Sequence, residues 1–322
     1  MNHTSPPRRL PLASEPARQG GAHLDRREFV QFTAGAFLAS LGLSAGCSPE
    51  LVEEALQDHF TRLSPDELQE TLARLEKSAK ERFGKDTTVA ATPAQPDVTF
   101  GYALDLAKCL GCRRCVYACV QENNQSRDPE IHWIRVYEMD KEHGVDFGHQ
   151  HADPYYDAEK VPQPGKFYLP VACQQCENPP CVNVCPTGAT WQTEDGITVV
   201  DYNWCIGCRY CMAACPYEAR KFNWKTPQIP KDEFNPKTHY LGNRPRPVGV
   251  VEKCTWCIQR TREGRYPACV EVCPAGARKF GNLLDEHSEI RRVLETKHVF
   301  VLKSDLNTRP KFYYYYGVEP RG

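Results

Sequence analysis

Four groups of cysteines are the residues of this sequence whose type and spacing could do chemistry. The groups are Cys109, Cys112, Cys115 and Cys119; Cys173, Cys176, Cys181 and Cys185; Cys205, Cys208, Cys211 and Cys215; and Cys254, Cys257, Cys269 and Cys273. The first and third have the spacing Cys-x2-Cys-x2-Cys-x3-Cys, and the second and fourth lengthen one gap, to x4 and x11. Three thiolates at x2 spacing can bind three irons of one iron–sulfur cluster, while the fourth cysteine reaches a second cluster. At four ligands per cluster, these cysteines predict four [4Fe–4S] clusters.

Three other uses of the thiols have to be weighed against this interpretation. A disulfide framework suits an exported chain with an even number of grouped cysteines, but such frameworks usually stabilise chains too small for a core. Zinc usually takes two separated Cys-x2-Cys pairs, and triplets such as 109/112/115 are awkward for it. A [3Fe–4S] cluster would require a missing ligand, and each group has four cysteines. The spacing favours [4Fe–4S] clusters and leaves disulfides and zinc as weaker alternatives.

Composition and other motifs point away from several functions. The chain has 322 residues, a formal net charge of −1 and basic residues spread along its length. A nucleic-acid-binding protein would need a concentrated basic face, so we expect no nucleic-acid partner. The sequence contains no phosphate-binding loop, no nucleophile elbow and no defensible pair of catalytic carboxylates. We therefore expect no catalytic site within this chain.

Charged and histidine residues near the cysteines have two interpretations each. Lys253, Arg113, Arg114 and Arg209 lie beside predicted ligands. They could raise cluster potentials, or be solvated surface charges, and we favour the second. The segment 143–153, "HGVDFGHQHAD", contains His143, His149 and His151 near acidic residues. It could bind a metal, but a polar loop is the more common role of such a stretch.

The N-terminal 47 residues resemble an export signal. Residues 26–31 read "RREFVQ" and precede a modest apolar run, which is typical of a twin-arginine signal. Such signals export folded proteins, which suits a cofactor assembled in the reducing cytoplasm. Cys47 follows small residues in "LSAGC", so it is a possible lipidation site; ordinary cleavage and an uncleaved anchor are the alternatives. The uncharged stretch 29–49 is too short in its apolar centre for a membrane span, and we expect no transmembrane helix.

The elements that must position the cysteines are short. Residues 48–97 predict a helical arm and linker: Ser64, Pro65 and Glu67 form a capping signature, and Gly84 ends the helix. We expect its Leu68 face to pack on its own domain rather than on a partner. The segment 86–97 has the composition of a linker.

Further elements follow from local patterns. Residues 189–201 predict a hairpin that turns at Asp195-Gly196. Residues 288–297 predict a helix capped by Ser288, and residues 299–303 a strand. The tyrosines 313–316 could bind a partner, but we favour a terminal strand on the core.

An internal repeat indicates a duplicated unit. "CPYEARKFN" (215–223) matches "CPAGARKFG" (273–281) at most positions, and "CPTGAT" (185–190) is a shorter copy. With these motifs, the chain resembles the four-cluster iron–sulfur subunits of the molybdopterin oxidoreductase, or dimethyl sulfoxide reductase, type of respiratory complex. The resemblance covers roughly residues 98–316 and is strongest in "CQQCENPPCVNVCPTGA", "CIGCRYCMAACPYEARKF" and "KCTWCIQRTREGRYPACVEVCPAGA".

The resemblance implies an α+β fold with two ferredoxin-like dicluster domains related by pseudo-two-fold duplication, after an N-terminal helical arm. One domain would combine residues 98–170 with 246–322, and the other would span 171–245. The resemblance also implies four ligand sets that each combine two groups. These are Cys109, Cys112, Cys115 with Cys273; Cys254, Cys257, Cys269 with Cys119; Cys173, Cys176, Cys181 with Cys215; and Cys205, Cys208, Cys211 with Cys185.

The implied function is to relay single electrons between a membrane quinone-interacting subunit and a molybdopterin catalytic subunit or multihaem cytochrome. The chain would then be a non-catalytic subunit, periplasmic, and associated with the membrane through its partners or a lipid on Cys47. Within the exported branch we favour the subunit of the sulfite-reductase-associated transmembrane complex. The alternative is a free periplasmic ferredoxin-like electron carrier.

Overall fold

A computed structural model of the chain describes residues 64–146, 148 and 150–317. The predicted signal segment 1–47, with Cys47, and the first part of the arm lie outside these residues. Within the described ranges, no helix combines the length and the apolar character needed to cross a membrane.

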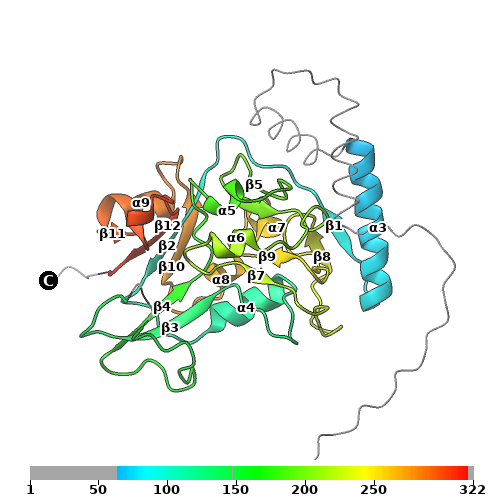
Figure 1. Cartoon of the computed structure of the whole chain (residues 1–322). Coiled ribbons are helices and arrows are strands. Elements are labelled where there is room, and N and C mark those ends of the chain that lie inside the picture. Colours follow the sequence, from blue (N-terminus) through cyan, green and yellow to red (C-terminus); the bar gives the residue numbers. More distant parts are fainter. Residues whose placement is uncertain (1–63, 147, 149, 318–322) are drawn as a thin grey trace, which may run out of the picture. The chain divides into compact units, whose positions relative to one another are not determined.

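The strands form one four-stranded sheet and several two-stranded ribbons (Figure 1). In the large sheet the order is β10 (Arg278–Asn282), β2 (Phe100–Asp105), β12 (Phe312–Tyr315) and β11 (Val299–Phe300). The ribbons pair β3 (Arg135–Asp140) with β4 (Lys166–Val171), β5 (Thr190–Gln192) with β6 (Thr198–Val200), β7 (Lys221–Phe222) with β9 (Val251–Glu252), and β1 (Thr88–Ala90) with β8 (Lys237–His239). The central strand β2 runs antiparallel to β10 and parallel to β12, with Leu104 opposite both Arg278 and Tyr314.

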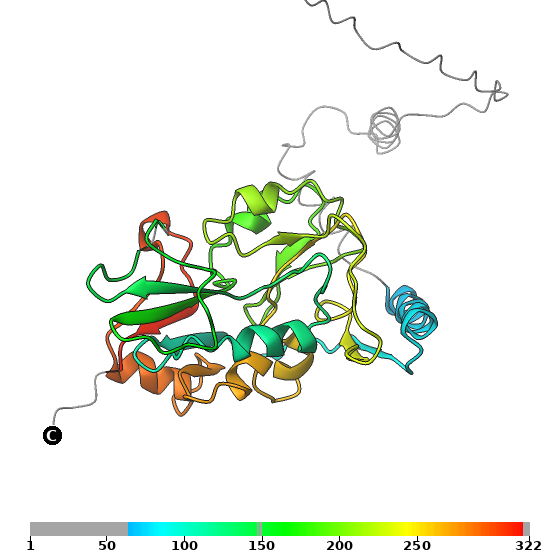
Figure 2. The ribbon, with the colours of Figure 1, turned by 90° about the horizontal axis from the view of Figure 1, so that it is seen from below.

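The helices between the strands are mostly single turns. They are α3 (Pro65–Phe83), α4 (Arg114–Glu122), α5 (Pro180–Asn183), α6 (Tyr210–Ala213), α7 (Ile258–Thr261), α8 (Ala268–Glu271), α9 (Glu289–Thr296) and the 3-10 helix η1 (Ser304–Leu306). Each cysteine group places its third cysteine in one of these helices: α4 contains Cys115, α5 contains Cys181, α6 contains Cys211 and α8 contains Cys269. Helices of one turn are unstable alone, so tertiary contacts must hold them. Figure 2 shows α4 and α8 side by side.

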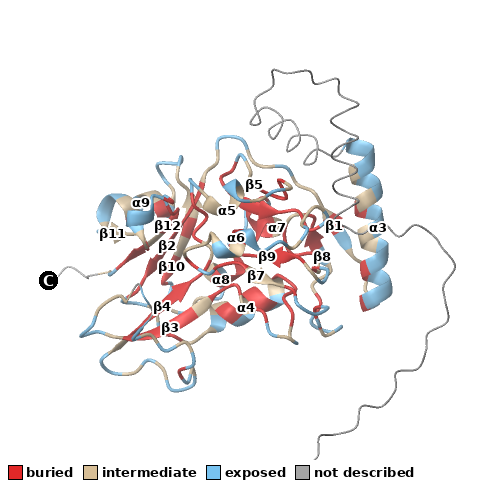
Figure 3. Ribbon diagram, in the orientation of Figure 1, coloured by how far each residue is buried: buried red, intermediate tan, exposed pale blue. Residues whose placement is uncertain are grey.

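The arm helix matches its sequence prediction. In α3 the Ser64 side chain accepts from the Glu67 N–H, the Glu67 carboxylate accepts from the Ser64 N–H, and Gly84 ends the helix in a left-handed conformation. Leu72 is buried against Val89 and Tyr240, so the helix packs on its own chain, as expected. The outer face of α3 stays exposed (Figure 3). The segment 86–97 is not an irregular linker throughout, because it contains β1, which pairs parallel with β8.

Other local predictions agree with the structure in part. The hairpin 189–201 is present as β5 and β6, with Thr190 opposite Val200. Helix α9 begins after Ser288, whose side chain accepts from the Arg291 N–H. The tyrosines 313–315 lie in β12 in the core sheet, as favoured. The predicted strand 299–303 is shorter, since β11 ends at Phe300.

Candidate metal centres

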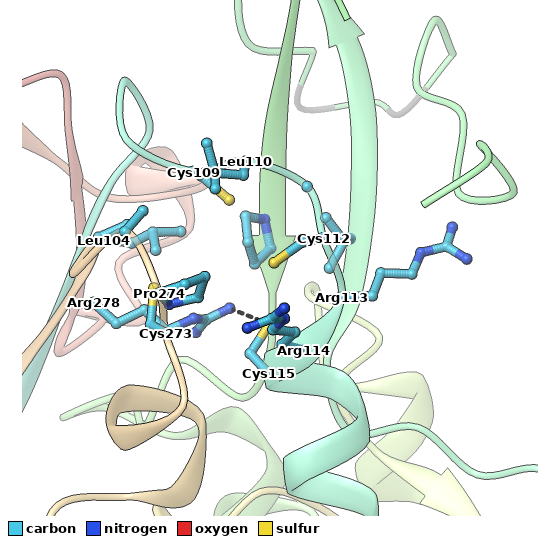
Figure 4. A pocket seen from close by; sticks show the side chains of 15 residues that line it. Leu104, Cys109, Leu110, Cys112, Arg113, Arg114, Cys115, Cys273, Pro274 and Arg278 are labelled. Carbon is cyan, nitrogen blue, oxygen red and sulfur yellow. Dashed lines mark hydrogen bonds between the residues drawn. The ribbon is translucent and has the colours of Figure 1, made fainter. Parts of the chain in front are cut away.

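The first set of thiols surrounds a pocket at the end of α4. Cys109, Cys112, Cys115 and Cys273 line it together with the apolar residues Leu104, Val136 and Pro170 (Figure 4). Four thiols that line one pocket are the donor set that binds a [4Fe–4S] cluster.

A second pocket repeats this arrangement at α6. It is lined by Cys185, Cys205, Cys208 and Cys211. Among the described cysteines Cys208 alone is exposed. The neighbouring Ile206 is 66% exposed. This centre therefore lies closest to solvent.

The remaining cysteines form two further sets, of which the Cys119 set is buried throughout and the Cys173 set is partly exposed. Burial raises the pKa of the Cys119 thiol well above its ordinary value, and the adjacent Cys254, Cys257 and Cys269 raise this pKa further. Burial also raises the pKa of Cys176 to about 12, and Cys173, Cys181 and Cys215 add to that rise. All four combinations that the resemblance implies are thus brought together in space.

Local contacts link the four sets in succession. Cys115 of the first set and Cys119 of the second both lie on α4. Gln175, in the loop of the Cys173 set, donates to the Cys254 carbonyl oxygen over 2.8 Å, and Cys181 and Cys185 are four residues apart. The Cys109 set therefore adjoins the Cys119 set, which adjoins the Cys173 set, which adjoins the Cys205 set, and we call this succession the row. Charges that pass between adjacent sets would travel from one end of this row to the other.

A shared backbone turn shapes the Cys-x2-Cys loops. The residue before the second cysteine has a positive φ in each loop: Gly111 (73°), Gln175 (45°), Gly207 (71°) and Trp256 (52°). Such turns direct successive backbone N–H groups into a concavity that favours anions, as at many iron–sulfur sites. In two loops the turn also requires glycine, because a Cβ at Gly111 would lie 2.4 Å from the Tyr168 ring, and one at Gly207 2.2 Å from the Gly249 carbonyl oxygen.

Several side chains donate hydrogen bonds to the sulfurs, and the sequence analysis missed them. Arg278 donates to Cys115 Sγ over 3.0 Å, and Arg220 donates to Cys181 Sγ over 3.0 Å. Gln125 Nε2 lies 3.1 Å from Cys119 Sγ, and Asn123 Nδ2 lies 3.5 Å from both Cys119 and Cys257. The arginines did carry a sequence signal, because both stand in the "ARKF" segment of the internal repeat.

One prediction about charges near the ligands was wrong. Lys253 is not a solvated surface charge: it is 1% exposed, and its Nζ donates to the Cys254 carbonyl oxygen over 2.7 Å. Arg114 and Arg209 are exposed, as expected. Arg113 is half-buried and stacks over the Tyr156 ring at 4.3 Å.

In the described part of the histidine segment, two imidazole rings lie near each other. The rings of His143 and His151 lie 5.6 Å apart, while His149 falls outside the described residues. Among the residues that the structure describes, no three histidine, cysteine or acidic side chains converge on a position for a single metal ion.

Comparisons with known proteins agree with this chemistry. Two family profiles, each described as a 4Fe–4S dicluster domain, match residues 165–248 and 242–283, and residues 108–189. A Halobacterium salinarum protein, named as an iron–sulfur subunit of dimethyl sulfoxide reductase, is 42% identical over 68% of this chain and 79% of its own length.

Two further relatives extend the match. A selenate reductase subunit of Mesobacillus selenatarsenatis is 33% identical over 90% of this chain and 96% of its own length. The iron–sulfur cluster-binding subunit of menaquinone reductase from Nitratidesulfovibrio vulgaris is 37% identical over 67% and 88%. The chain therefore belongs to the 4Fe–4S dicluster iron–sulfur subunits of the molybdopterin oxidoreductase complexes, the family that serves dimethyl sulfoxide, selenate and tetrathionate reductases.

Proposed function

We propose that this electron-transfer subunit holds four [4Fe–4S] clusters, each on three cysteines of one group and one of another. The sets are Cys109, Cys112, Cys115 and Cys273; Cys119, Cys254, Cys257 and Cys269; Cys173, Cys176, Cys181 and Cys215; and Cys185, Cys205, Cys208 and Cys211. The observation that supports the proposal is the row of four thiol sets. A bound cluster supplies one-electron redox chemistry. The protein contributes thiolate ligands and hydrogen bonds to sulfur.

The relay follows from the order of the sets. Electrons enter at one end of the row and leave at the other, and residues 98–170 with 246–322 and residues 171–245 serve as the two dicluster domains. The exposed Cys208 makes the Cys205 set the natural point of exchange with a partner. The partners at the two ends are an integral membrane quinone-interacting subunit and a molybdopterin catalytic subunit or multihaem cytochrome.

The location is part of the same proposal. The arginine pair in "RREFVQ" supports twin-arginine export of the folded protein to the periplasm. Membrane association then depends on the partner subunits or on a lipid attached to Cys47.

The cluster count is tested on anaerobically purified full-length protein. Iron and acid-labile sulfide assays should each find about sixteen atoms per chain, as four cubes require. About eight of each would reject the four-cluster proposal and leave two clusters. A folded but iron-free protein would reject the family's chemistry for this chain.

The assignment as a complex subunit has a separate test. Membranes from cells that produce the protein are solubilised in detergent and fractionated by size. Co-migration with an integral membrane protein supports the subunit. A soluble monomer that retains all its iron supports the alternative of a free electron carrier.

A further inference from the structure

Two arginines occupy the same place in the internal repeat. Arg220 follows Cys215 by five residues, and Arg278 follows Cys273 by five residues, both within "ARKF". Both are buried, at 3% and 5% exposure. A buried guanidinium carries its charge under almost all conditions and is costly unless it is paired. What each arginine is paired with therefore indicates its role.

Most of the other buried arginines are paired with carboxylates. Arg246 lies 2.7 Å from Glu252, Arg262 lies 2.8 Å from Asp195, and Arg244 lies 3.6 Å from Asp201. These are ordinary buried ion pairs that hold loops together.

Arg220 and Arg278 have different partners. Each donates to a cysteine sulfur over 3.0 Å, and each donates its second nitrogen to a hydroxyl: Thr190 Oγ1 at 3.2 Å and Tyr102 OH at 2.8 Å. Figure 4 shows Arg278 reaching the thiol of Cys115 across the pocket. The Nε of Arg220 is buried and has no hydrogen-bond partner among the described protein atoms. The sulfur contacts place both positive charges at the cluster sites.

The four thiol sets fall into two halves: the Cys109 and Cys119 sets, and the Cys173 and Cys205 sets. Each arginine also reaches the second set of its own half. From Arg278 the contact passes through Tyr102, whose hydroxyl lies 3.3 Å from Cys269 Sγ in the Cys119 set. From Arg220 the contact passes through Thr190, which lines the pocket of the Cys205 set. Each arginine therefore contacts one thiol set of its half directly and reaches the other through a hydroxyl side chain.

We propose that Arg220 and Arg278 are paired redox-tuning residues, each raising the reduction potentials of both clusters in its own half. The proposal rests on the four-cluster function proposed above. Reduction adds negative charge to a cluster, and a buried cation nearby stabilises that charge with little screening. Hydrogen bonds to ligand sulfurs act in the same direction. Both copies of the internal repeat therefore contain a redox-tuning arginine as well as cluster ligands.

The test is a potentiometric titration followed by electron paramagnetic resonance on the full-length protein. In Arg220→Gln, two of the four midpoint potentials should fall, with at least a tenfold loss in the equilibrium constant for reduction, or about 59 mV for a one-electron couple. In Arg278→Gln the other two should fall, and the double variant should shift all four. Unchanged potentials, or an equal shift of all four in a single variant, would overturn the proposal.

Matched variants separate tuning from assembly. Arg114→Gln removes an exposed charge beside Cys115 and should shift no potential appreciably, because solvent screens it. Arg220→Lys and Arg278→Lys keep the charge and should shift the same pairs less, so they decide the question where a glutamine variant loses iron. Lysine variants with full iron whose potentials fall by about 59 mV or more would contradict a role for the charge, and so would glutamine variants with full iron and unchanged potentials. A wild-type protein without four clusters would instead reject the proposed function, a result that the iron assay detects first.

Discussion

At the scale of the residue, the four thiol sets differ in what donates to their sulfurs. The Cys119 set has two neutral amides, from Asn123 and Gln125, in addition to the indirect link through Tyr102. Arg220 and Arg278 instead donate directly to the Cys173 and Cys109 sets. Because charge and hydrogen bonding to sulfur both set potentials, we expect the four potentials to be unequal along the row.

A substitution at Gly207 tests the tight Cys-x2-Cys loop. In Gly207→Ala the new Cβ would lie 2.2 Å from the Gly249 carbonyl oxygen, at a φ of 71°. The backbone conformation alone costs roughly 1–2 kcal/mol, and the clash forces the loop open. We expect the Cys205 set to lose its cluster, which removes about four of about sixteen irons. Gly264→Ala is the control, since its φ is 77° with no atom within 4 Å of the new Cβ. Full iron content in Gly207→Ala would show that the loop adapts.

The cysteines could be predicted as ligands from the sequence, whereas the arginines could not. The spacing of cysteines such as Cys205, Cys208 and Cys211 is local, so it can be recognised from the sequence alone. Arg278 and Cys115 are 163 positions apart, and Arg220 and Cys181 are 39 apart. Their contact depends on the fold, and the repeated "ARKF" segment marked only that these residues recur.

At the scale of the element, features that depend on local sequence signals could be predicted, whereas a strand that depends on non-local pairing could not. The capping box of α3 and the Asp-Gly turn of the β5–β6 hairpin each lie within a few residues, and both elements formed as predicted. Strand β1 lies in a segment whose composition predicts a linker. Its conformation depends on pairing Thr88 with Lys237, almost 150 positions later, which no local pattern reveals.

His239 makes the β1–β8 ribbon sensitive to acid. Its Nδ1 accepts from the Leu241 N–H over 3.1 Å, and its Nε2 lies 3.2 Å from the Thr92 carbonyl oxygen, which suits the neutral ring. Burial lowers its pKa to about 4, with Arg262 contributing against the opposing effects of Thr92 and Asp195. In the unfolded chain the pKa of this histidine is about 6.5, so the unfolded chain binds more protons than the folded protein between about pH 6.5 and 4. The stability that the neutral His239 contributes is therefore present above about pH 6.5 and is lost as the pH falls through this window.

Hydrogen–deuterium exchange of β1 measures this effect. Between about pH 7 and 5.5 the opening free energy of the ribbon should fall by about 1 kcal/mol, after correction for intrinsic exchange. His239→Gln cannot be protonated, so its ribbon, although weaker, should show no such dependence. Equal pH dependence in both proteins would assign the effect to another group.

At the scale of the whole molecule, the two halves share one core. The main cluster of buried residues joins Leu104 and Tyr314 of the large sheet to Ile197 and Val199 of the β5–β6 hairpin. Backbone hydrogen bonds join Glu177 to Arg309 and Lys311 to Gln174. The β7–β9 ribbon pairs Phe222 with Val251 across the expected domain boundary. The duplicated units therefore support each other, which the repeat in the sequence did not indicate.

This shared core predicts that the clusters are lost together. Leu302 is 3% exposed, packs in the main core, and its carbonyl oxygen accepts from the Tyr217 hydroxyl of the other half over 3.2 Å. Leu302→Ala should destabilise the fold by about 2–5 kcal/mol. On heating, the visible absorbance of all four clusters should then bleach in one step, at a lower temperature than in the wild type. Leu284→Ala, the same change at a 62% exposed position, should bleach close to the wild-type temperature, since such surface changes stay within about 0.5 kcal/mol. Bleaching in two steps, with half the iron retained between them, would mean that the halves unfold independently despite their common core.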